Sequence, residues 1–309
     1  MLAACRFLSR HGKLVLIAGL IAGAGLPELA QALRPFIAPM IVSLLFLAVL
    51  RLGPAGLRAG MNGMHRAAGV ALILQLALPV SAALAFAALG ILAHPLAMGV
   101  ILVLAAAPIT GSPNITLMAG GDPAPALQQL VVGTALLPLT VIPVFWLMPA
   151  FGSPVAVARA ALELLGLIAL AGGAALALRH FRIVPGTQNA LDAMDGLAAL
   201  LLGLVVIGLM SAIGPAILDD RRDLLFAMLV VFALNVPLQM ATSLFARGAD
   251  PQSAPALGVV AGNRNIALFL SVLPAQTADQ LLLFIGCFQV PMYVTPFLLA
   301  RWYRWTSRP

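Results

Sequence analysis

Ten long runs of apolar residues, separated by short loops, follow one another along this chain of 309 residues. A helix needs roughly 20 such residues to cross a bilayer. The runs cover residues 14–33, 35–52, 67–91, 95–119, 125–150, 155–178, 190–214, 223–246, 253–274 and 279–302. With 62% of its residues hydrophobic and 9% charged, the chain cannot cover itself with polar surface. We therefore expect an all-α integral membrane protein with ten transmembrane helices and the lipid bilayer as its surroundings.

The basic residues are unevenly distributed between alternate loops. If the N-terminus is cytoplasmic, twelve of the 17 lysines and arginines lie at cytoplasmic ends, four (Arg34, Arg159, Arg221 and Arg222) lie at outer ends, and Arg264 lies inside a run. The positive-inside rule then places both termini in the cytoplasm, as an even number of spans also requires. The same rule explains the net charge of +7 without nucleic acid as a partner. We expect the plasma (inner) membrane of a bacterium.

The second half of the sequence echoes the first at an offset of about 151–158 residues. Three pairs of segments match in order, namely 75–79 with 232–237, 111–114 with 262–265, and 138–143 with 291–296. Five spans per half give the halves, residues 1–153 and 154–309, opposite topologies. Inverted repeats with interrupted helices at matching positions are typical of secondary transporters. Proline and glycine are common in membrane helices, so chance echoes are the alternative.

Helices four and nine of this scheme each contain residues that suit a lipid-facing helix poorly. Gly111 and Pro113 interrupt the fourth run, and residues 262–265 interrupt the ninth. Non-helical backbone at that depth survives only inside protein or beside a water-filled cavity. We expect new helices to begin after Asn114 and Asn265, with these side chains as N-caps. Two such electropositive helix ends would form an anion site.

Arg264 lies about ten residues from either end of its run. Placing an arginine at the centre of a membrane costs roughly 2.5–3.5 kcal/mol on insertion scales, so a central ionisable residue is a functional candidate. Its guanidinium stays protonated and would give the site a fixed positive charge. The structural alternative is an ion pair with Glu163, although Arg159 lies one helical turn before that acid.

These residues resemble the bile acid:sodium symporter family over essentially the whole chain. Residues 111–122 are similar to the G-T-A-S-N…G-D segment of the family, and residues 262–265 to its E-x-G-x-Q-N motif. Gln75 matches a glutamine in helix three, and Phe288-Gln289 falls near a polar pair that lines the substrate cavity. The resemblance implies that a core of helices 3–5 and 8–10 moves against a panel of helices 1, 2, 6 and 7, with broken helices four and nine crossing beside the solute. It also implies an organic anion as substrate.

The sequence departs from the family where sodium would bind. Val260 takes the place of an acid and Arg264 that of a glutamine, while Pro113, Ala126 and Leu130 replace hydroxyl residues. At this spot an acid is therefore absent and a guanidinium is present. The repulsion between a guanidinium and a cation about 4 Å away is roughly 4 kcal/mol at an effective dielectric near 20. We therefore expect sodium-independent transport, with Arg264 holding the crossing together in place of sodium.

The leading interpretation is an alternating-access carrier of a small organic anion, with no cofactor and no metal site. The alternative is a sodium symporter with rearranged ligands such as Gln75, Asn114 and backbone carbonyls. No catalytic residues are expected, because the spans carry no paired acids, Ser/His pair or metal-ligand cluster. The predicted substrate-binding residues are Gly111, Ser112, Asn114, Thr116, Asn263, Arg264, Asn265 and Gln289. The predicted ion-site or crossing positions are Gln75, Pro113, Asn114, Val260 and Arg264, and the candidates for proton coupling are Glu163, Asp192 and Asp195.

Overall fold

The computed structural model describes residue 8 and residues 11–308, and this part of the chain is built from helices without a β-strand. Arg6 and Arg10, two of the basic residues behind the predicted orientation, lie outside the described residues. In the first half, the helices are α2 (Gly12–Gly25), α3 (Pro27–Leu33), η1 (Arg34–Phe36), α4 (Ile37–Met61), α5 (Met64–Leu72), η2 (Ile73–Ala77), α6 (Leu78–Ala88), α7 (Pro95–Ala105), α8 (Ser112–Met118), α9 (Pro123–Leu147) and η3 (Pro149–Phe151). In the second half, they are α10 (Pro154–His180), α11 (Gln188–Leu209), α12 (Ile213–Asp219), α13 (Arg221–Ala249), α14 (Ala254–Gly262), η4 (Ile266–Ser271), α15 (Ala275–Leu298) and α16 (Ala300–Thr306).

Seven helical segments within the described residues are long and apolar enough to cross a membrane. They are Pro27–Met61, Met64–Ala88, Pro123–Leu147, Pro154–His180, Gln188–Asp219, Arg221–Ala249 and Ala275–Leu298. Two shorter apolar helices, Leu14–Gly25 and Pro95–Ala105, fall in other predicted runs. The chain is therefore a multi-pass all-α membrane protein.

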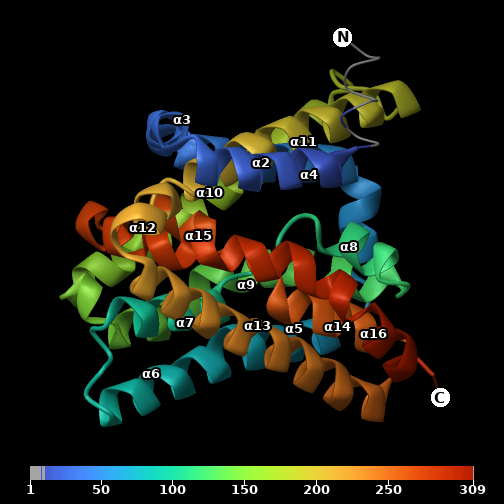
Figure 1. Ribbon diagram of the computed structural model, residues 1–309. Helices are drawn as coiled ribbons and strands as arrows, with labels where there is room; N and C mark the ends of the chain where they lie inside the picture. Colours follow the sequence, from blue (N-terminus) through green and yellow to red (C-terminus); the bar gives the residue numbers. More distant parts are fainter. Residues whose placement is uncertain (1–7, 9–10, 309) are drawn as a thin grey trace.

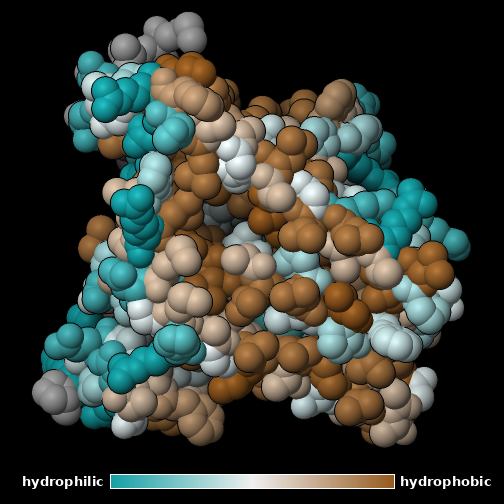
Figure 2. All heavy atoms as spheres, turned by 180° about the vertical axis from the view of Figure 1, so that it is seen from behind, coloured by the Kyte–Doolittle hydropathy of each residue, from teal (hydrophilic) through white to brown (hydrophobic). Residues whose placement is uncertain are grey.

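The outer surface of the protein is apolar, as a lipid-facing surface should be. Phe245 is 84% exposed, and Leu170 and Leu218 are comparably open. Figure 2 shows hydrophobic side chains over the middle of the molecule and hydrophilic ones gathered toward its two ends. Apolar exposure on this scale would drive association in water, but it costs nothing in hydrocarbon.

The helices form two layers. In the first layer, α10 packs on α4, and α11 packs on α2 and α4; in the second, α13 packs on α14 and α15, and α5 packs on α9. Figure 1 shows α2, α4 and α11 above α15, with α13, α5 and α6 below it. Small residues bring the first-layer helices close together, since a Cβ at Gly23 of α2 would lie 2.6 Å from the Cβ of Met210, just after α11. The start of α2 and the end of α16 lie toward the same end of the molecule (Figure 1).

Candidate functional site

The chain leaves the helical conformation at both positions where the sequence predicts a break. α7 ends at Ala105 and helix resumes only at Ser112, while α14 ends at Gly262 and the chain continues as a 3-10 helix from Ile266. Both breaks lie in the second layer, on the side that faces the first.

The two breaks cross each other and pair through their backbones. Pro108 faces Arg264 in an isolated antiparallel β-bridge. On either side of it, the Ile109 amide donates to the Asn263 carbonyl at 3.0 Å and the Asn265 amide donates to the Ala107 carbonyl at 2.8 Å. Each break therefore supplies the hydrogen-bond partners that the other has lost, which is what allows irregular backbone at membrane depth.

The Arg264 side chain ties the crossing together. It is 1% exposed, its Nε donates to the Ala261 carbonyl at 2.8 Å, and its Nη1 donates to the Ala106 carbonyl at 2.8 Å. Ala261 belongs to the last turn of α14, and Ala106 directly follows α7. The last carbonyls of a helix carry partial negative charge and favour a cation. The guanidinium therefore bridges the electronegative ends of two helices.

The ion pair with Glu163 that was the structural alternative for Arg264 does not form. The Glu163 carboxylate accepts from Arg159 Nε at 2.8 Å, one turn away on α10. The third guanidinium nitrogen of Arg264, Nη2, is buried and has no hydrogen-bond partner among the described residues. One donor of a permanently charged group is thus left unpaired within the described part of the chain.

The expected N-caps at Asn114 and Asn265 are wrong. α8 begins at Ser112, so Asn114 is its third residue, and Gly111 precedes the helix without a side-chain cap. Pro113 explains the earlier start, because proline fits the first helical turn, where its missing N–H is not needed. Asn265 does precede a helix, but that helix is the short 3-10 segment η4, and the Asn265 side chain makes no cap bond.

A buried polar network supports the second break from behind. The Asn235 amide of α13 donates to the Gly262 carbonyl at 2.7 Å, and Thr295 of α15 donates to the Asn235 side-chain oxygen at 2.6 Å. Gln239 hydrogen-bonds to both of these side chains and to the Tyr303 hydroxyl. This network was not among the predicted site residues. The signal for it in the sequence is a set of polar residues on one face of an otherwise apolar run, at Asn235, Gln239 and Ser243.

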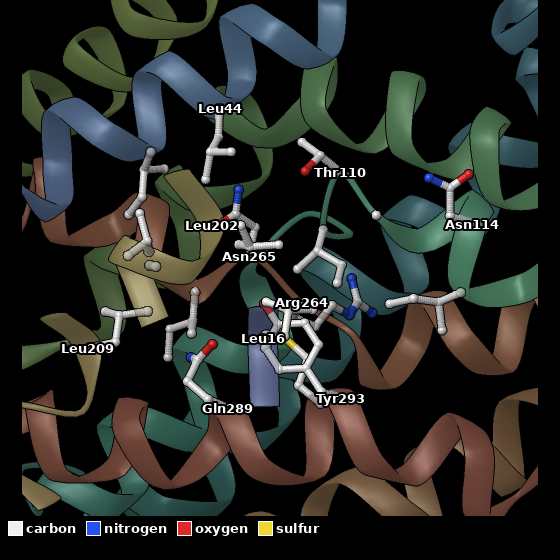
Figure 3. Close-up of a pocket in the computed structure, with 18 of the residues that line it drawn as sticks. Leu16, Leu44, Thr110, Asn114, Leu202, Leu209, Arg264, Asn265, Gln289 and Tyr293 are labelled. Atoms are coloured by element: carbon white, nitrogen blue, oxygen red, sulfur yellow. The ribbon is translucent and has the colours of Figure 1, made fainter. Parts of the chain in front are cut away.

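A cavity of about 280 Å³ lies between the crossing and the first layer. Figure 3 shows the side chains around it, with Leu16 and Leu44 from the first layer, and Arg264, Asn265 and Gln289 from the second. A neighbouring space of about 360 Å³ shares Thr110, Gly111 and Asn114 with it and is also lined by Arg51 and Asp195. One wall of this cleft is aliphatic and the facing one carries hydrogen-bonding groups. Figure 2 shows the hollow between the layers from behind.

Five of the eight predicted substrate-binding residues line the cavity, namely Gly111, Asn114, Arg264, Asn265 and Gln289. The other three do not, and they are fully buried. The Ser112 hydroxyl donates to the Ile109 carbonyl at 2.7 Å, and the Thr116 hydroxyl to the Ser112 carbonyl at 2.9 Å. The Asn263 amide is buried without a partner among the described groups. These three side chains are turned into the protein.

The positions proposed for an ion site fall into two environments. Gln75 lies in a π-helical turn, η2, with its oxygen buried and unpartnered within the described chain. A Cβ at Gly133 would lie 2.5 Å from the Gln75 amide nitrogen and 3.2 Å from Pro108, so this side chain packs against the crossing. Val260, by contrast, lies in a small buried apolar cluster with Ala126 and Ala256. Pro113 lines the cleft beside Asn114.

The remaining candidate acids lie on α11. Asp195 forms an ion pair with Arg51 of α4 at the edge of the cleft. Asp192 accepts a hydrogen bond of 2.8 Å from Gln188 on its own helix. Each of these carboxylates therefore has a local partner, and of the two only Asp195 borders the cleft.

No protein-family model matches this chain, and no curated protein matches it. The resemblance to the bile acid:sodium symporter family therefore rests on the sequence motifs alone.

Proposed function

We propose that this protein is a secondary-active transporter that carries a small organic anion across the membrane by alternating access. The observation that carries the proposal is the placement of Arg264. A permanently charged side chain sits where two interrupted helices cross, and it lines a cavity between two helical layers. A charge at that depth is costly unless it serves a function.

The preference for an anion follows from the charge and donors around the cavity. Arg264 is the one ionisable side chain with a full positive charge among the described residues that line this space, and its Nη2, although buried in this conformation, is unpaired among the described residues. Asn114, Asn265 and Gln289 add neutral amide groups. A carboxylate that accepts from Nη2 would gain a charge-assisted hydrogen bond in a poorly solvated site.

The proposal includes independence from sodium. A sodium ion would need several oxygen ligands, with a carboxylate among them where the related motifs have an acid. Val260 and Ala126 make that spot apolar. The Ala261 and Ala106 carbonyls, which could serve a cation, already accept from the guanidinium. Arg264 therefore supplies the positive charge that the crossing requires. Ten spans in two inverted repeats, with a panel moving against a core, complete this proposal.

The experiment is a thermal-shift screen of the purified protein against small carboxylates and sterol acids, each measured in sodium chloride and in choline chloride. An anion that raises the melting temperature equally in both salts is the expected result, and its amide analogue should have no effect. Uptake of that anion into proteoliposomes should then be the same in either salt. Strict dependence on sodium would overturn the sodium-independent carrier and favour rearranged sodium ligands.

A gain-of-function variant makes the sodium test independent of the substrate. Val260→Glu together with Arg264→Gln restores an acid and a neutral amide where the resemblance places sodium ligands. A ligand present at 100 times its dissociation constant stabilises the folded protein by about 2.7 kcal/mol. We expect sodium to raise the melting temperature of this double variant but not that of the unmodified chain.

A further inference from the structure

The two ends of the cleft are built differently. At the end where α2 starts and α16 finishes, the cavity is continuous with the space beside Arg51 and Asp195. At the opposite end, α11 and α12 contact α15, and Arg34 of η1 reaches Asp279 in the first turns of α15. The layers touch there, so the cleft is closed on that side.

An apolar seam makes the closed end tight. A Cβ at Gly286 of α15 would lie 2.9 Å from the Leu209 carbonyl and 3.0 Å from Ile213 Cγ1, so the second layer meets α11 and α12 almost backbone to backbone. Leu209, Ile213 and Ile285 are all buried. Water cannot pass between helices packed this closely.

An ion pair lies beyond the seam. Arg34 of η1, in the first layer, bonds to Asp279 of α15, in the second. Their side chains are 40% and 59% exposed, so the pair borders solvent at the rim. Both residues also line a crevice with Gln31, Pro215 and Ser211, and the Ser211 hydroxyl is buried there without a partner among the described groups.

The other two ion pairs recorded in the described part of the chain do not join the two layers. Arg51 and Asp195 connect α4 to α11 within the first layer, and Arg159 and Glu163 are one turn apart on α10. Of these three ion pairs, Arg34–Asp279 is the one that connects the two layers. Any movement that separates the layers at this end must break their contact.

We propose that Arg34 and Asp279 form a gate that holds the closed end of the cleft shut while the opposite end is open. The proposal rests on the alternating-access function above. A partly exposed ion pair has modest strength, so it biases the equilibrium between the two openings without locking it. The seam beneath it excludes solvent, and the pair determines how often that seam opens.

Cysteine labelling of the purified full-length protein tests this gate without knowledge of the substrate. In a background with Cys5→Ser and Cys287→Ala, Ser211→Cys reports on the crevice and Ala198→Cys reports on the open mouth, which Ala198 lines. Asp279→Asn removes the negative charge from the gate and leaves the positive charge of Arg34 in place. It should speed maleimide labelling at position 211 by about two- to five-fold, the factor expected for a pair of this exposure. Labelling at position 198 should not become faster.

The charge swap, Arg34→Asp with Asp279→Arg, should return both rates to those of the unmodified pair. Arg159→Gln, which breaks an ion pair within one helix, should leave both unchanged. An unaltered rate at position 211 in Asp279→Asn, or a swap that behaves like the single variant, would overturn the gate. Faster labelling at both positions would mean that the two ends open together, which would keep the gate but refute alternating access, so the two proposals fail separately.

Discussion

The two breaks that cross in the second layer are stabilised in different ways. The first restarts as an α-helix at Ser112, and its hydroxyl groups bond to nearby carbonyls of the same segment. The second continues as a 3-10 helix and is held by a guanidinium on one side and by Asn235 on the other. The two breaks lie at matching positions of similar sequence segments, yet different interactions stabilise them.

This difference indicates that the two breaks have different roles in the site. The first break presents Asn114, Thr110 and Gly111 to the cleft and needs little from the rest of the protein. The second break is almost completely buried, and long-range contacts keep it in place. If this division holds, damage to the second break should destabilise the protein, whereas damage on the cavity side of the first should weaken only binding.

The largest effect is expected for Arg264→Gln. The variant loses two charge-assisted hydrogen bonds, each with a typical net contribution of about 1.5–3 kcal/mol, and leaves two carbonyls at helix ends short of a partner. We expect stability to fall by about 3 kcal/mol, measured as a lower melting temperature in detergent, and anion binding to disappear. Arg264→Lys keeps the charge but can reach fewer acceptors. Its melting temperature and anion affinity should lie between those of Arg264→Gln and those of the unmodified chain.

Arg159→Gln is the matched control for Arg264→Gln, because it removes an arginine whose side chain is 80% exposed. Its cost should stay below about 1 kcal/mol. If Arg264→Gln melts like the control but no longer binds the anion, the guanidinium contacts substrate without holding the crossing.

A smaller loss of stability is expected for Asn235→Leu. The substitution keeps the side-chain volume but removes the donor to Gly262 and the acceptor for Thr295. Leaving buried polar groups unpaired costs about 1–3 kcal/mol. The measurement is again the melting temperature, together with labelling of Ala198→Cys to follow the cavity. A variant as stable as the parent would mean that the second break does not need support from α13.

The sequence was sufficient to locate the breaks but not to describe them. Proline, glycine and asparagine inside apolar runs are local signals, so both interruptions, and the place of Arg264 at the second of them, could be predicted. The start of α8 depends on where Pro113 is tolerated, and the 3-10 form of η4 depends on packing. The sequence also could not predict that the side chains of Ser112, Thr116 and Asn263 point into the protein. A polar residue in an apolar run gives no indication of which neighbour it bonds.

Long-range partners explain the remaining misses. Thr295 lies 60 positions from Asn235, and Tyr303 lies 64 from Gln239. Such pairs follow from how α13 and α15 pack, which periodicity alone does not determine. The apolar contact between Val260 and Ala126 is of the same kind. Two positions where the sequence departs from the motifs that it resembles thus lie in one apolar cluster of the structure.

The smallest effect, and the most specific, is expected for Asn114→Ala at the first break. Asn114 is exposed to the cleft near the start of α8, so alanine should leave stability unchanged within about 0.5 kcal/mol. Losing one neutral hydrogen bond to the anion, worth about 0.5–1.5 kcal/mol, should raise its dissociation constant about two- to tenfold. Ser112→Ala, two residues away but buried against Ile109, should show the reverse pattern, with a small loss of stability and unchanged affinity. If the two variants behave alike, the cavity side and the buried side of this break are not distinct, and Asn114 does not contact the anion.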